Sequence, residues 1–531
     1  MATIEKKTNN WSKRSHANTA DIAMSADSLN CYFAGIATDP NYSADAISDA
    51  VRNAESLQSQ SRDNISDFHP YSADHIAIVL HHTANTAPGP GGIPAWVYKT
   101  LAAQISGIVS KLINYSISQS LAPIAWRCAH ITPVAKTNPV TGPSDFRPIS
   151  VTPILSRLTE RLIVHDYLLP CLKPELFCDQ YAYKPTGSTT CALIDFTHRI
   201  HTMLENNNYV RCVFIDFSRA FDTIDHLILI RKLTTLQVPI FIIKWLVSFL
   251  SDRTQTTCLN YDRSASARIT RSIIQGSGVG PILYIMFAFD LKPLDLFNIL
   301  LKYADDSTLL CPENTGTSVE LEMAHIIEWS KTNKLLLNLL KTKEMVFHRP
   351  NPRRILFPDK LQDIERVSEF KLLGVLLQTD LRFNDYVSAL VTVCNQRLYL
   401  LTQLKKQGLK LAETDNVFKS IILTKLIYAL PMLFGYLTDH QIEQINSVFR
   451  KARKWQLTID EYDIVTIAEK LRYDLFQQSK CITHCINHLY TPTQNTSIMG
   501  LRQRGHNFFI PSLKYVHNSK GFLVQCLQKY R

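Results

Sequence analysis

The stretch LKYADDSTLL, residues 301–310, places two adjacent aspartates, Asp305 and Asp306, inside a run that otherwise predicts a buried β-strand. Burying an isolated carboxylate is costly, because desolvation opposes its charged form. Another acid, Asp216, stands near the end of a second strongly apolar run, VRCVFIDF at residues 210–217. Acids at these places need a partner that compensates for the loss of water.

A divalent metal site is the chemistry that this pattern favours. Side chains alternate between the two faces of a strand, so an acid at a strand end can face a common cleft. If the two strands are neighbours, the carboxylates converge and repel one another unless cations lie between them. Mg²⁺ takes carboxylate and phosphate oxygens, and two such ions about 3.5–4 Å apart support in-line displacement at phosphorus. For any one aspartate taken singly, the alternative is a turn residue or a solvated strand end.

The bulk composition is that of a folded, basic protein. Its 531 residues include 57 Lys and Arg against 46 Asp and Glu, a net charge of +11, which suits a polyanion such as nucleic acid. The start, MATIEKKTNN, lacks the layout of a signal peptide, and no apolar run reaches the roughly 18 residues that cross a bilayer. Twelve cysteines without paired spacing indicate free thiols in a reducing compartment. We expect an intracellular protein without membrane contact.

Strand and helix patterns alternate through the middle of the chain, and helices dominate its last third. Strands are predicted at 126–136, 210–217, 256–260, 267–274 and 344–349. Helices are predicted at 29–36, 97–119, from about 223, at 282–291 and at 321–335. Residues 146–169 read as a loop followed by a helix. The pattern indicates an α+β fold with a largely helical C-terminal part.

A series of blocks over residues 85–378 resembles, in order, the reverse transcriptases of LINE-type (non-long-terminal-repeat) retrotransposons of the jockey-like group. The blocks are GPGGIP, PIAWRCAHITPVAK, FRPISVTPILSRLTERLI, QYAYKPTGSTTCA, FIDFSRAFDTIDH, WLVSFLSDRTQ, QGSGVGP, KYADDSTL, NKLLLNLLKTKEMVF and FKLLGVLL. The resemblance implies a right-hand polymerase with fingers, a palm built on an antiparallel sheet, and a thumb.

The resemblance also implies catalytic roles for the aspartates. Asp216 matches the first catalytic aspartate of the family, and Asp305 and Asp306 match the pair in its YxDD hairpin. Together they are expected to hold two Mg²⁺ ions, for which Mn²⁺ can substitute. We expect Asp305 and Asp216 to bridge both ions and Asp306 to be the more indirect partner.

Three basic residues match phosphate-binding positions of the family. Lys136 and Arg147 match positions of the fingers that hold the nucleoside triphosphate, and a guanidinium and an ammonium suit phosphate oxygens. Lys341, in LNLLKT, matches a lysine near the pyrophosphate leaving group. Without the match, each would read as a solvated surface charge.

Three further residues match the nucleotide pocket. Phe221 falls where a bulky ring lies beneath the incoming sugar and would clash with a 2′-hydroxyl, which favours deoxynucleotides. Gln275 and Gly276 correspond to a QG pair that lines the pocket, where glycine permits close backbone approach. The alternative reading of Phe221 is an ordinary core side chain.

The chain departs from the family pattern outside the metal ligands. QGSGVGP stands where QGSxLGP is usual, so that Gly278 adds flexibility before the following helix. Lys184 replaces the usual arginine in YAYKPTGST, and Gly91 stands where an acid is typical. Together these departures are compatible with a decaying or inefficient copy.

The resemblance divides the chain into four predicted segments. These are an N-terminal arm, partly disordered, at 1–84; fingers and palm at 85–378, with a core of about 118–378; a helical thumb at 379–475; and a helical or irregular segment at 476–531. Elements of this family usually carry an endonuclease upstream, and residues 1–84 are too few for that domain. We therefore expect the endonuclease to be absent from this chain.

The segment CITHCINHLY, residues 481–490, places Cys481, His484, Cys485 and His488 on successive turns of a predicted helix. These are zinc-ligand types, yet the spacing matches no zinc finger or knuckle, and one helix rarely closes a tetrahedron. An apolar helix that bears Cys and His explains the segment as well.

The sequence therefore predicts an RNA-directed DNA polymerase that extends a DNA primer on an RNA template with dNTPs. An RNA-dependent RNA polymerase is disfavoured by Phe221 and by the YADD tetrad. A remnant that only binds nucleic acid is disfavoured by the intact aspartates. Priming on chromosomal DNA would require access to the nucleus.

Overall fold

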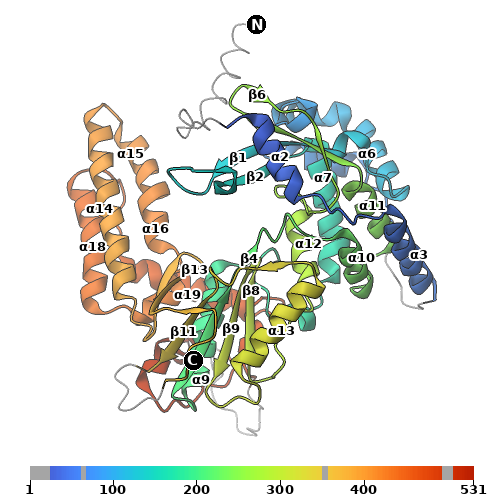
Figure 1. The fold of residues 1–531 in the computed structure, drawn as a ribbon. Helices are drawn as coiled ribbons and strands as arrows, with labels where there is room; N and C mark the ends of the chain where they lie inside the picture. The colour runs from blue at the N-terminus through green and yellow to red at the C-terminus, as the bar shows by residue number, and fades with distance from the viewer. Residues whose placement is uncertain (1–23, 61–66, 350–356, 493–505, 531) are drawn as a thin grey trace, which may run out of the picture. The chain divides into compact units, whose positions relative to one another are not determined.

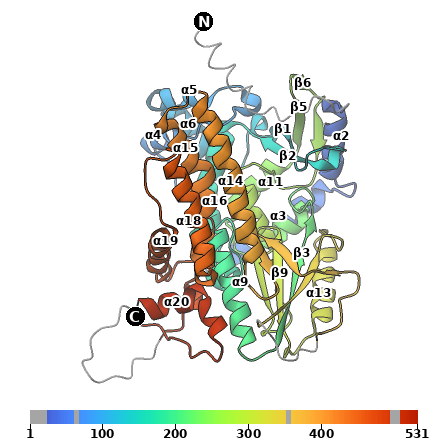
Figure 2. The same cartoon turned by 90° about the vertical axis from the view of Figure 1, so that its left-hand side faces the viewer.

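The computed structural model describes residues 24–60, 67–349, 357–492 and 506–530. The chain forms two compact units, each built from segments that are distant in sequence. The first unit comprises residues 1–172 and 219–287, and the second comprises residues 173–218 and 288–531. Both units combine helices with sheets (Figures 1 and 2). The crossings between units follow residues 172, 218 and 287, none of which is a predicted segment boundary.

A mixed sheet organises the first unit. Its strands are β1 (Cys128–Ala135), β2 (Phe146–Val151), β5 (Arg253–Leu259), β6 (Asp262–Arg263) and β7 (Ala267–Ile269). β1 pairs antiparallel with β2 and parallel with β5, and β6 and β7 both pair antiparallel with β5. The predicted strand at 126–136 is confirmed. Strands also form within 253–259 and at 267–269, but residues 267–269 pair with 253–255 rather than with 256–260, and Cys258 and Leu259 pair with β6 instead.

The start of the 146–169 segment is a strand, so the prediction of a loop there is wrong. Pro148 discourages a strand assignment because proline has no N–H to donate. In the structure Pro148 lies opposite Pro133 in the β1–β2 register. The two residues without an N–H donor therefore face each other at one position of the ladder, and the strand pairing continues on both sides of them.

Helices surround this sheet in the first unit. The longer ones are α2 (Ala26–Ile36), α3 (Ala44–Gln60), α4 (Ala73–His81), α5 (Ala95–Thr100), α6 (Ala102–Ser118), α7 (Ile154–Ile163), α10 (His226–Thr235), α11 (Ile240–Leu250) and α12 (Gly280–Phe287). Short helical turns lie at Gly89–Gly91, Ile124–Arg127, Pro143–Asp145, Val164–Leu168 and Leu169–Cys171. The predicted helix at 29–36 is confirmed. The segment predicted as one helix at 97–119 is divided at Leu101 into α5 and α6, and the helix predicted at 282–291 ends at Phe287. The helix expected from about 223 begins at His226.

The described part of the predicted N-terminal arm is folded into the first unit. Leu29 and Phe33 of α2 are buried in one cluster with Ile131 of β1 and Phe146 of β2. The Asn30 side-chain oxygen accepts hydrogen bonds from Thr257 Oγ1 (3.0 Å) and Gln255 Nε2 (3.2 Å) on β5. Helix α2, which lies in the predicted N-terminal arm, therefore packs on the sheet of the first unit.

A five-stranded sheet in the order β12-β11-β3-β9-β8 organises the second unit. Its strands are β3 (Tyr209–Ile215), β8 (Ile299–Tyr303), β9 (Asp306–Pro312), β11 (Lys343–His348) and β12 (Glu365–Arg366). All pairings are antiparallel except that of β11 with β12. Two smaller sheets pair β4 (Phe217–Ser218) with β10 (Leu336–Leu337) and β13 (Glu369–Leu372) with β14 (Val375–Gln378). Strand β3, which ends directly before Asp216, and strand β9, which begins at Asp306, are therefore neighbours. This is the condition under which the sequence pattern brings the carboxylates together.

Two helices contact opposite faces of this sheet. Alternate residues of β3, Val210, Cys212 and Phe214, share a buried cluster with Phe196 of α9 (Thr189–Leu204). On the other face, Arg211 of β3 forms an ion pair with Glu320 (2.8 Å) on α13 (Val319–Thr332). The period-two alternation of the strand thus assigns one face to an apolar helix and the other to a polar contact.

The rest of the second unit is helical, as predicted. Its helices are α8 (Pro174–Phe177), α14 (Asn384–Lys406), α15 (Leu411–Phe418), α16 (Thr424–Ile427), α17 (Leu430–Leu433), α18 (Asp439–Lys454), α19 (Ile464–Ser479) and α20 (Phe522–Lys529). Shorter helical turns lie at Lys419–Leu423, Phe434–Tyr436, Asn487–Leu489 and Val516–Lys520. Figure 2 shows α14 and α18 running alongside each other.

No single helix among the described residues has both the length and the apolar composition needed to cross a membrane. One bent pair of helical segments, Leu411–Ile427 with Leu430–Tyr436, meets those two criteria together.

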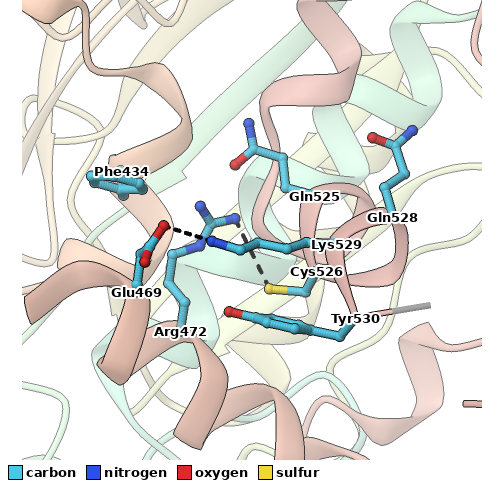
Figure 3. Close-up of a pocket in the computed structure, with 8 residues that line it drawn as sticks. All are labelled: Phe434, Glu469, Arg472, Gln525, Cys526, Gln528, Lys529 and Tyr530. Carbon is cyan, nitrogen blue, oxygen red and sulfur yellow. Dashed lines mark hydrogen bonds and ion pairs between the residues drawn. The ribbon is translucent and has the colours of Figure 1, made fainter. Parts of the chain in front are cut away.

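The C-terminal helix α20 packs onto α19 around a pocket of about 320 Å³ (Figure 3). The Arg472 guanidinium lies 5.5 Å from the ring centre of Phe434 and 5.8 Å from that of Phe522. Lys529 on α20 forms an ion pair with Glu469 on α19 (2.6 Å). None of the predicted catalytic or nucleotide-binding residues lines this pocket, and its contacts serve to attach the chain's last helix to the second unit.

Candidate active site

The three aspartates meet at one end of the five-stranded sheet of the second unit. Strands β8 and β9 form a hairpin in which Tyr303 pairs with Asp306, so that Ala304 and Asp305 make a two-residue turn. Ile215 of β3 pairs with Ser307 of β9, and one step further along the ladder Asp216 lies opposite Asp306. The ladder thus gives Asp306 the position facing Asp216, and it offers no support for treating Asp306 as the more indirect partner.

Electrostatics also indicates that the carboxylates are close. Partial desolvation raises the pKa of Asp306 to about 6, and the charges of Asp305 and Asp216 contribute in the same direction. The Asp306 side chain still reaches solvent, so the repulsion between carboxylates is the cause that the geometry supports most directly. A cation bound among these groups would remove that repulsion.

A small pocket of about 80 Å³ opens at this point. Asp216 and Asp306 line it together with Lys341 and Lys371. Its apolar wall includes Phe214 and Phe370, whose rings stack with centroids 3.8 Å apart. The pocket therefore combines paired carboxylates with lysine side chains beside them, a set that suits a metal–phosphate ligand.

The backbone of Asp216 is fixed by the segment that carries Lys341. The Asn338 N–H donates to the Asp216 carbonyl oxygen (2.8 Å), and the Asp216 N–H donates to Thr342 Oγ1 (3.4 Å). The Thr342 hydroxyl in turn donates to the Asn338 carbonyl oxygen (2.8 Å). Lys341 follows directly on these anchors, which explains why the predicted lysine lines the same pocket as Asp216.

The hairpin turn rests on Gln180, a residue that the sequence analysis did not single out. Gln180 is buried, and its Oε1 accepts hydrogen bonds from the N–H groups of Tyr181 (3.0 Å), Ala182 (2.9 Å) and Ala304 (3.1 Å). Ala304 has a left-handed φ of +57°, a conformation that disfavours a residue with a Cβ. Gln180 thereby helps to hold the turn that presents Asp305.

A buried lysine next to the turn provides a second anchor. Lys302 Nζ donates to the carbonyl oxygens of Ala288 and Leu291, at 3.0 Å each, and pairs with Asp179 (3.1 Å). The Lys302 backbone also exchanges hydrogen bonds with Asp179 and Tyr181. A lone lysine in an apolar strand gives no sequence signal for this role, although its place two residues before the turn is visible in KYADD.

In the first unit, Lys136 and Arg147 lie on one face of the β1–β2 hairpin. Arg147 pairs with Val134, and Lys136 follows Val134 by two residues, so the three side chains share a face. Both basic residues are exposed. Lys136 Nζ donates to the Ser144 carbonyl oxygen (2.9 Å) across the loop that joins the strands. The hairpin thus presents two cations side by side.

Backbone contacts bring the remaining predicted residues of the first unit together. The Gln275 carbonyl oxygen accepts from Ser150 N–H on β2 (2.7 Å), and the Phe221 carbonyl oxygen accepts from Ile273 N–H (3.0 Å). The Phe221 ring stacks on Tyr284 of α12, with centroids 4.7 Å apart. A single local cluster in the first unit therefore holds Phe221, Gln275 and the β2 strand that carries Arg147.

Gly276 occupies a position that requires glycine. Its φ is +113°, and a Cβ built there would lie 2.4 Å from the Ser150 carbonyl oxygen. Beside it, Gln275 Oε1 is buried and makes no hydrogen bond within the described residues. Gly278, noted as a departure from the family pattern, donates its N–H to Glu160 Oε2 (2.6 Å) and begins the turn into α12.

The segment 481–490 is not the helix that its periodicity predicts. Helix α19 ends at Ser479, and a run of turns follows until a short 3₁₀ turn at Asn487–Leu489. Four zinc-ligand side chains therefore do not line up on one helix face. Of the four, His484 and Cys485 are buried, and they lie beside Cys191 of α9.

Comparison with known proteins agrees with this arrangement. Residues 134–377 match the family described as "Reverse transcriptase (RNA-dependent DNA polymerase)". The chain is 24% identical over 406 residues to a probable RNA-directed DNA polymerase from transposon X-element and 27% identical over 386 residues to one from transposon BS, both of Drosophila melanogaster. It is 24% identical over 377 residues to the RNA-directed DNA polymerase from mobile element jockey of the same organism.

These matches cover 72, 69 and 68% of this chain and 44, 42 and 41% of the respective relatives. The chain thus spans less than half the length of the relatives that it matches. The matched region contains Asp216, Asp305 and Asp306 and each of the predicted nucleotide-binding residues. Residues 134–377 of this chain therefore match the reverse transcriptase family, and the chain is similar to the RNA-directed DNA polymerases of mobile element jockey and transposon X-element.

Proposed function

We propose that the chain is an RNA-directed DNA polymerase that extends the 3′-hydroxyl of a DNA primer on an RNA template. The observation that carries the proposal is the meeting of Asp216 with the turn at Asp305 and Asp306 across neighbouring strands. In the reaction, the primer hydroxyl displaces pyrophosphate from a dNTP, so the products are a primer longer by one nucleotide and pyrophosphate.

The aspartates fit a pair of hard divalent cations. Their donor atoms are all oxygens, which Mg²⁺ and Mn²⁺ prefer, and within the described residues neither Asp216 nor Asp306 is engaged in an ion pair. Asp216, Asp305 and Asp306 would hold the ions. When bound, two such ions activate the attacking hydroxyl and stabilise the leaving oxygen.

In this proposal, the basic residues of the two units bind different parts of the nucleotide. Lys341 and Lys371, which line the pocket of Asp216 and Asp306, are placed to attract phosphate oxygens near the metal ligands. Lys136 and Arg147, on one face of the β1–β2 hairpin, are suited to the triphosphate because an arginine can bind two phosphate oxygens at once. These contacts position the nucleotide rather than change its chemistry.

The local cluster around Phe221 suits selection of the sugar. Phe221 is held by its stack on Tyr284, and Gly276 leaves the backbone bare at a site where no side chain fits. The buried and unpaired Gln275 Oε1 is an acceptor that a nucleotide hydroxyl could satisfy. The proposal assigns to Phe221 the rejection of a 2′-hydroxyl.

The same proposal extends to architecture and partners. The strands β3, β8, β9 and β11 would form the palm, the β1–β2 region the fingers, and the helices after residue 378 the thumb that grips the template–primer backbone, where phosphate contacts give affinity without sequence preference. RNA template, DNA primer and dNTPs are the proposed partners. If the enzyme primes on chromosomal DNA, it works inside the cell with access to the nucleus.

Primer extension tests the proposal. Purified protein, poly(rA) with an oligo(dT) primer, dTTP and Mg²⁺ should yield extended DNA, and Asp305→Ala should yield none. Asp74→Asn, a change of an exposed aspartate on α4, is the matched control and should extend like the wild type. Preference for ribonucleotides would favour an RNA polymerase, and nucleic-acid binding without incorporation would favour an inactive remnant.

A further inference from the structure

A cluster of metal-ligand side chains lies apart from the aspartates in the second unit. The ligand atoms of Cys191, His484 and Cys485 all lie within 4.8 Å of one another, and all three residues are buried. The residues are remote in sequence, since Cys191 opens α9 and the other two follow α19. Such a convergence of two thiols and an imidazole in the interior has the composition of a zinc site.

The spacing of the ligand atoms is near that of a tetrahedral zinc site. Zn–S bonds of about 2.3 Å and Zn–N bonds of about 2.0–2.1 Å at tetrahedral angles place ligand atoms roughly 3.6–3.8 Å apart. In the structure Cys485 Sγ lies 4.0 Å from His484 Nδ1. The Ile486 N–H donates a long hydrogen bond to the same nitrogen (3.4 Å), so the lone pair of this nitrogen is lightly engaged.

Cys191 sits where a thiolate is stabilised. It is the third residue of α9, and its N–H donates to the side chain of the N-cap residue Ser188 (3.1 Å). The N-terminus of a helix favours negative charge and lowers the pKa of a cysteine.

The loop before α9 connects the cluster to the rest of the site. The Thr186 carbonyl oxygen accepts from Cys485 Sγ (3.1 Å) and from Cys191 Sγ (3.8 Å), and Thr186 Oγ1 accepts from the Cys485 N–H (2.9 Å). A few residues earlier, Gln180 supports the turn of Asp305. A ligand that holds residues 484–485 in this position therefore also holds the loop between Gln180 and α9, and Gln180 supports the aspartate hairpin.

We propose that Cys191, His484 and Cys485 bind one Zn²⁺ ion, with water as the fourth ligand, and that the ion fastens the segment after α19 to the start of α9. Two thiolates balance the charge of the ion, so the buried site is neutral. The Thr186 carbonyl oxygen is placed to accept a hydrogen bond from the water. Cys481, exposed and hydrogen-bonded to Thr483 (3.2 Å), is outside the site.

Metal analysis of the full chain, purified under reducing conditions without chelator, tests the proposal. We expect about one zinc ion per chain in the wild type and in Cys481→Ser, and a loss of most of it in Cys191→Ser and Cys485→Ser. Replacement of zinc by Co²⁺ should give a thiolate-to-cobalt charge-transfer band in the wild type and in Cys481→Ser. Equal zinc content in the wild type and in Cys191→Ser would overturn the proposal.

A second measurement needs no variant and so does not depend on whether the serine variants fold. The wild-type chain is alkylated with and without zinc after removal of metal by a chelator, and the labelled cysteines are identified by mass spectrometry. Zinc should protect Cys191 and Cys485 and leave Cys481 reactive. Labelling that does not change with zinc, or a Cys191–Cys485 disulfide in its place, would contradict the proposal. Neither experiment measures polymerase activity, so the zinc site and the proposed function can fail independently.

Discussion

The two hairpins that carry the predicted site residues are built in opposite ways. The β8–β9 hairpin presents acids at a turn whose backbone is held from below by buried Gln180 and Lys302. The β1–β2 hairpin presents Lys136 and Arg147 on an exposed face, where one Lys136 hydrogen bond to the Ser144 carbonyl oxygen spans the loop. The acidic hairpin is anchored inside the protein, and the basic hairpin projects its charges into solvent.

The difference follows from what each charge has to do. Metal ligands must be placed within tenths of an ångström, because coordination distances and angles are narrow. Carboxylates that repel one another also need a rigid support to stay together. A long cationic side chain can reach a phosphate from many backbone positions, and solvent stabilises it until it does. Activity should therefore fall when a residue that supports the aspartates is replaced. On the basic hairpin, it should fall only when Lys136 or Arg147 itself is replaced.

The largest effect is expected from Asp216→Asn. The amide keeps the shape but removes a metal ligand, so single-turnover addition of a dNTP should fall by about 10³-fold or more. The melting temperature should stay equal or rise, because a source of repulsion at Asp306 is gone. Asp74→Asn is the control. Activity within about tenfold of the wild type would show that Asp216 is no ligand.

The next effect is expected from Gln180→Ala, which removes the support rather than a ligand. The buried N–H groups of Tyr181, Ala182 and Ala304 lose their acceptor, and each unsatisfied group costs about 1–3 kcal/mol where water cannot replace the bond. Urea denaturation should show a loss of about 2–4 kcal/mol, with a fall in activity. Gln478→Ala, on the exposed side of α19, should change stability by less than about 0.5 kcal/mol.

A smaller effect is expected from Lys136→Ala and Arg147→Ala. Each should raise the KM for dNTP by about tenfold, as the loss of one charge-assisted contact of about 1.4 kcal/mol implies. The free energy of unfolding should not change, because both side chains are exposed. Arg147→Lys should restore part of the affinity, and Arg161→Ala, an exposed change on α7, should leave KM as it is. A large loss of stability in Lys136→Ala would contradict the proposed difference between the two hairpins.

The smallest effect concerns pH. The folded-state pKa of Asp306 is about 6, above the ordinary value of 3.8 for an aspartate, so the folded state binds this proton more tightly than the unfolded state does. The resulting stabilisation is complete below pH of about 4 and is lost as the pH rises through about 6. Denaturation in EDTA between these pH values should show a stronger loss of stability with rising pH in the wild type than in Asp306→Asn.

Asp222 of the first unit contributes a slope of the same sign, since burial raises its pKa to about 6. The comparison with Asp306→Asn removes that contribution, because Asp222 is present in both proteins. Saturating Mg²⁺ should also reduce the slope of the wild type by keeping Asp306 ionised. Identical slopes for the wild type and Asp306→Asn would show that the carboxylates do not interact.

The sequence allowed the strands of the acidic hairpin to be predicted, since each combines a long apolar run with acids that have no structural reason to be there. It missed β2 because the register that places Pro148 opposite Pro133 depends on a partner strand. It also failed at 481–490, where Cys and His at helical spacing suggested a helix. There the chain instead turns so that His484 and Cys485 meet Cys191, a contact that no local pattern encodes.

The residues that support the candidate site through hydrogen bonds were the part of it that the sequence predicted least. Gln180 and Lys302 are single polar residues without periodicity or motif, and their roles arise from backbone groups that only the fold brings to them. Asn338 and Thr342, which hold the backbone of Asp216, lie beside Lys341 but gave no signal of their own. Charged ligands leave a pattern in the sequence because their chemistry is unusual for a strand, whereas hydrogen-bond supports use ordinary residues.

The most direct test of the account is the metal dependence of single-nucleotide addition on an RNA template with a DNA primer. The wild type should add a dNTP only with Mg²⁺ or Mn²⁺, at a rate that saturates with metal, and Asp216→Asn should remain inactive at every metal concentration. Addition that proceeds in EDTA, or wild-type rates in Asp216→Asn at saturating metal, would contradict the claim that these aspartates form a divalent-metal polymerase site.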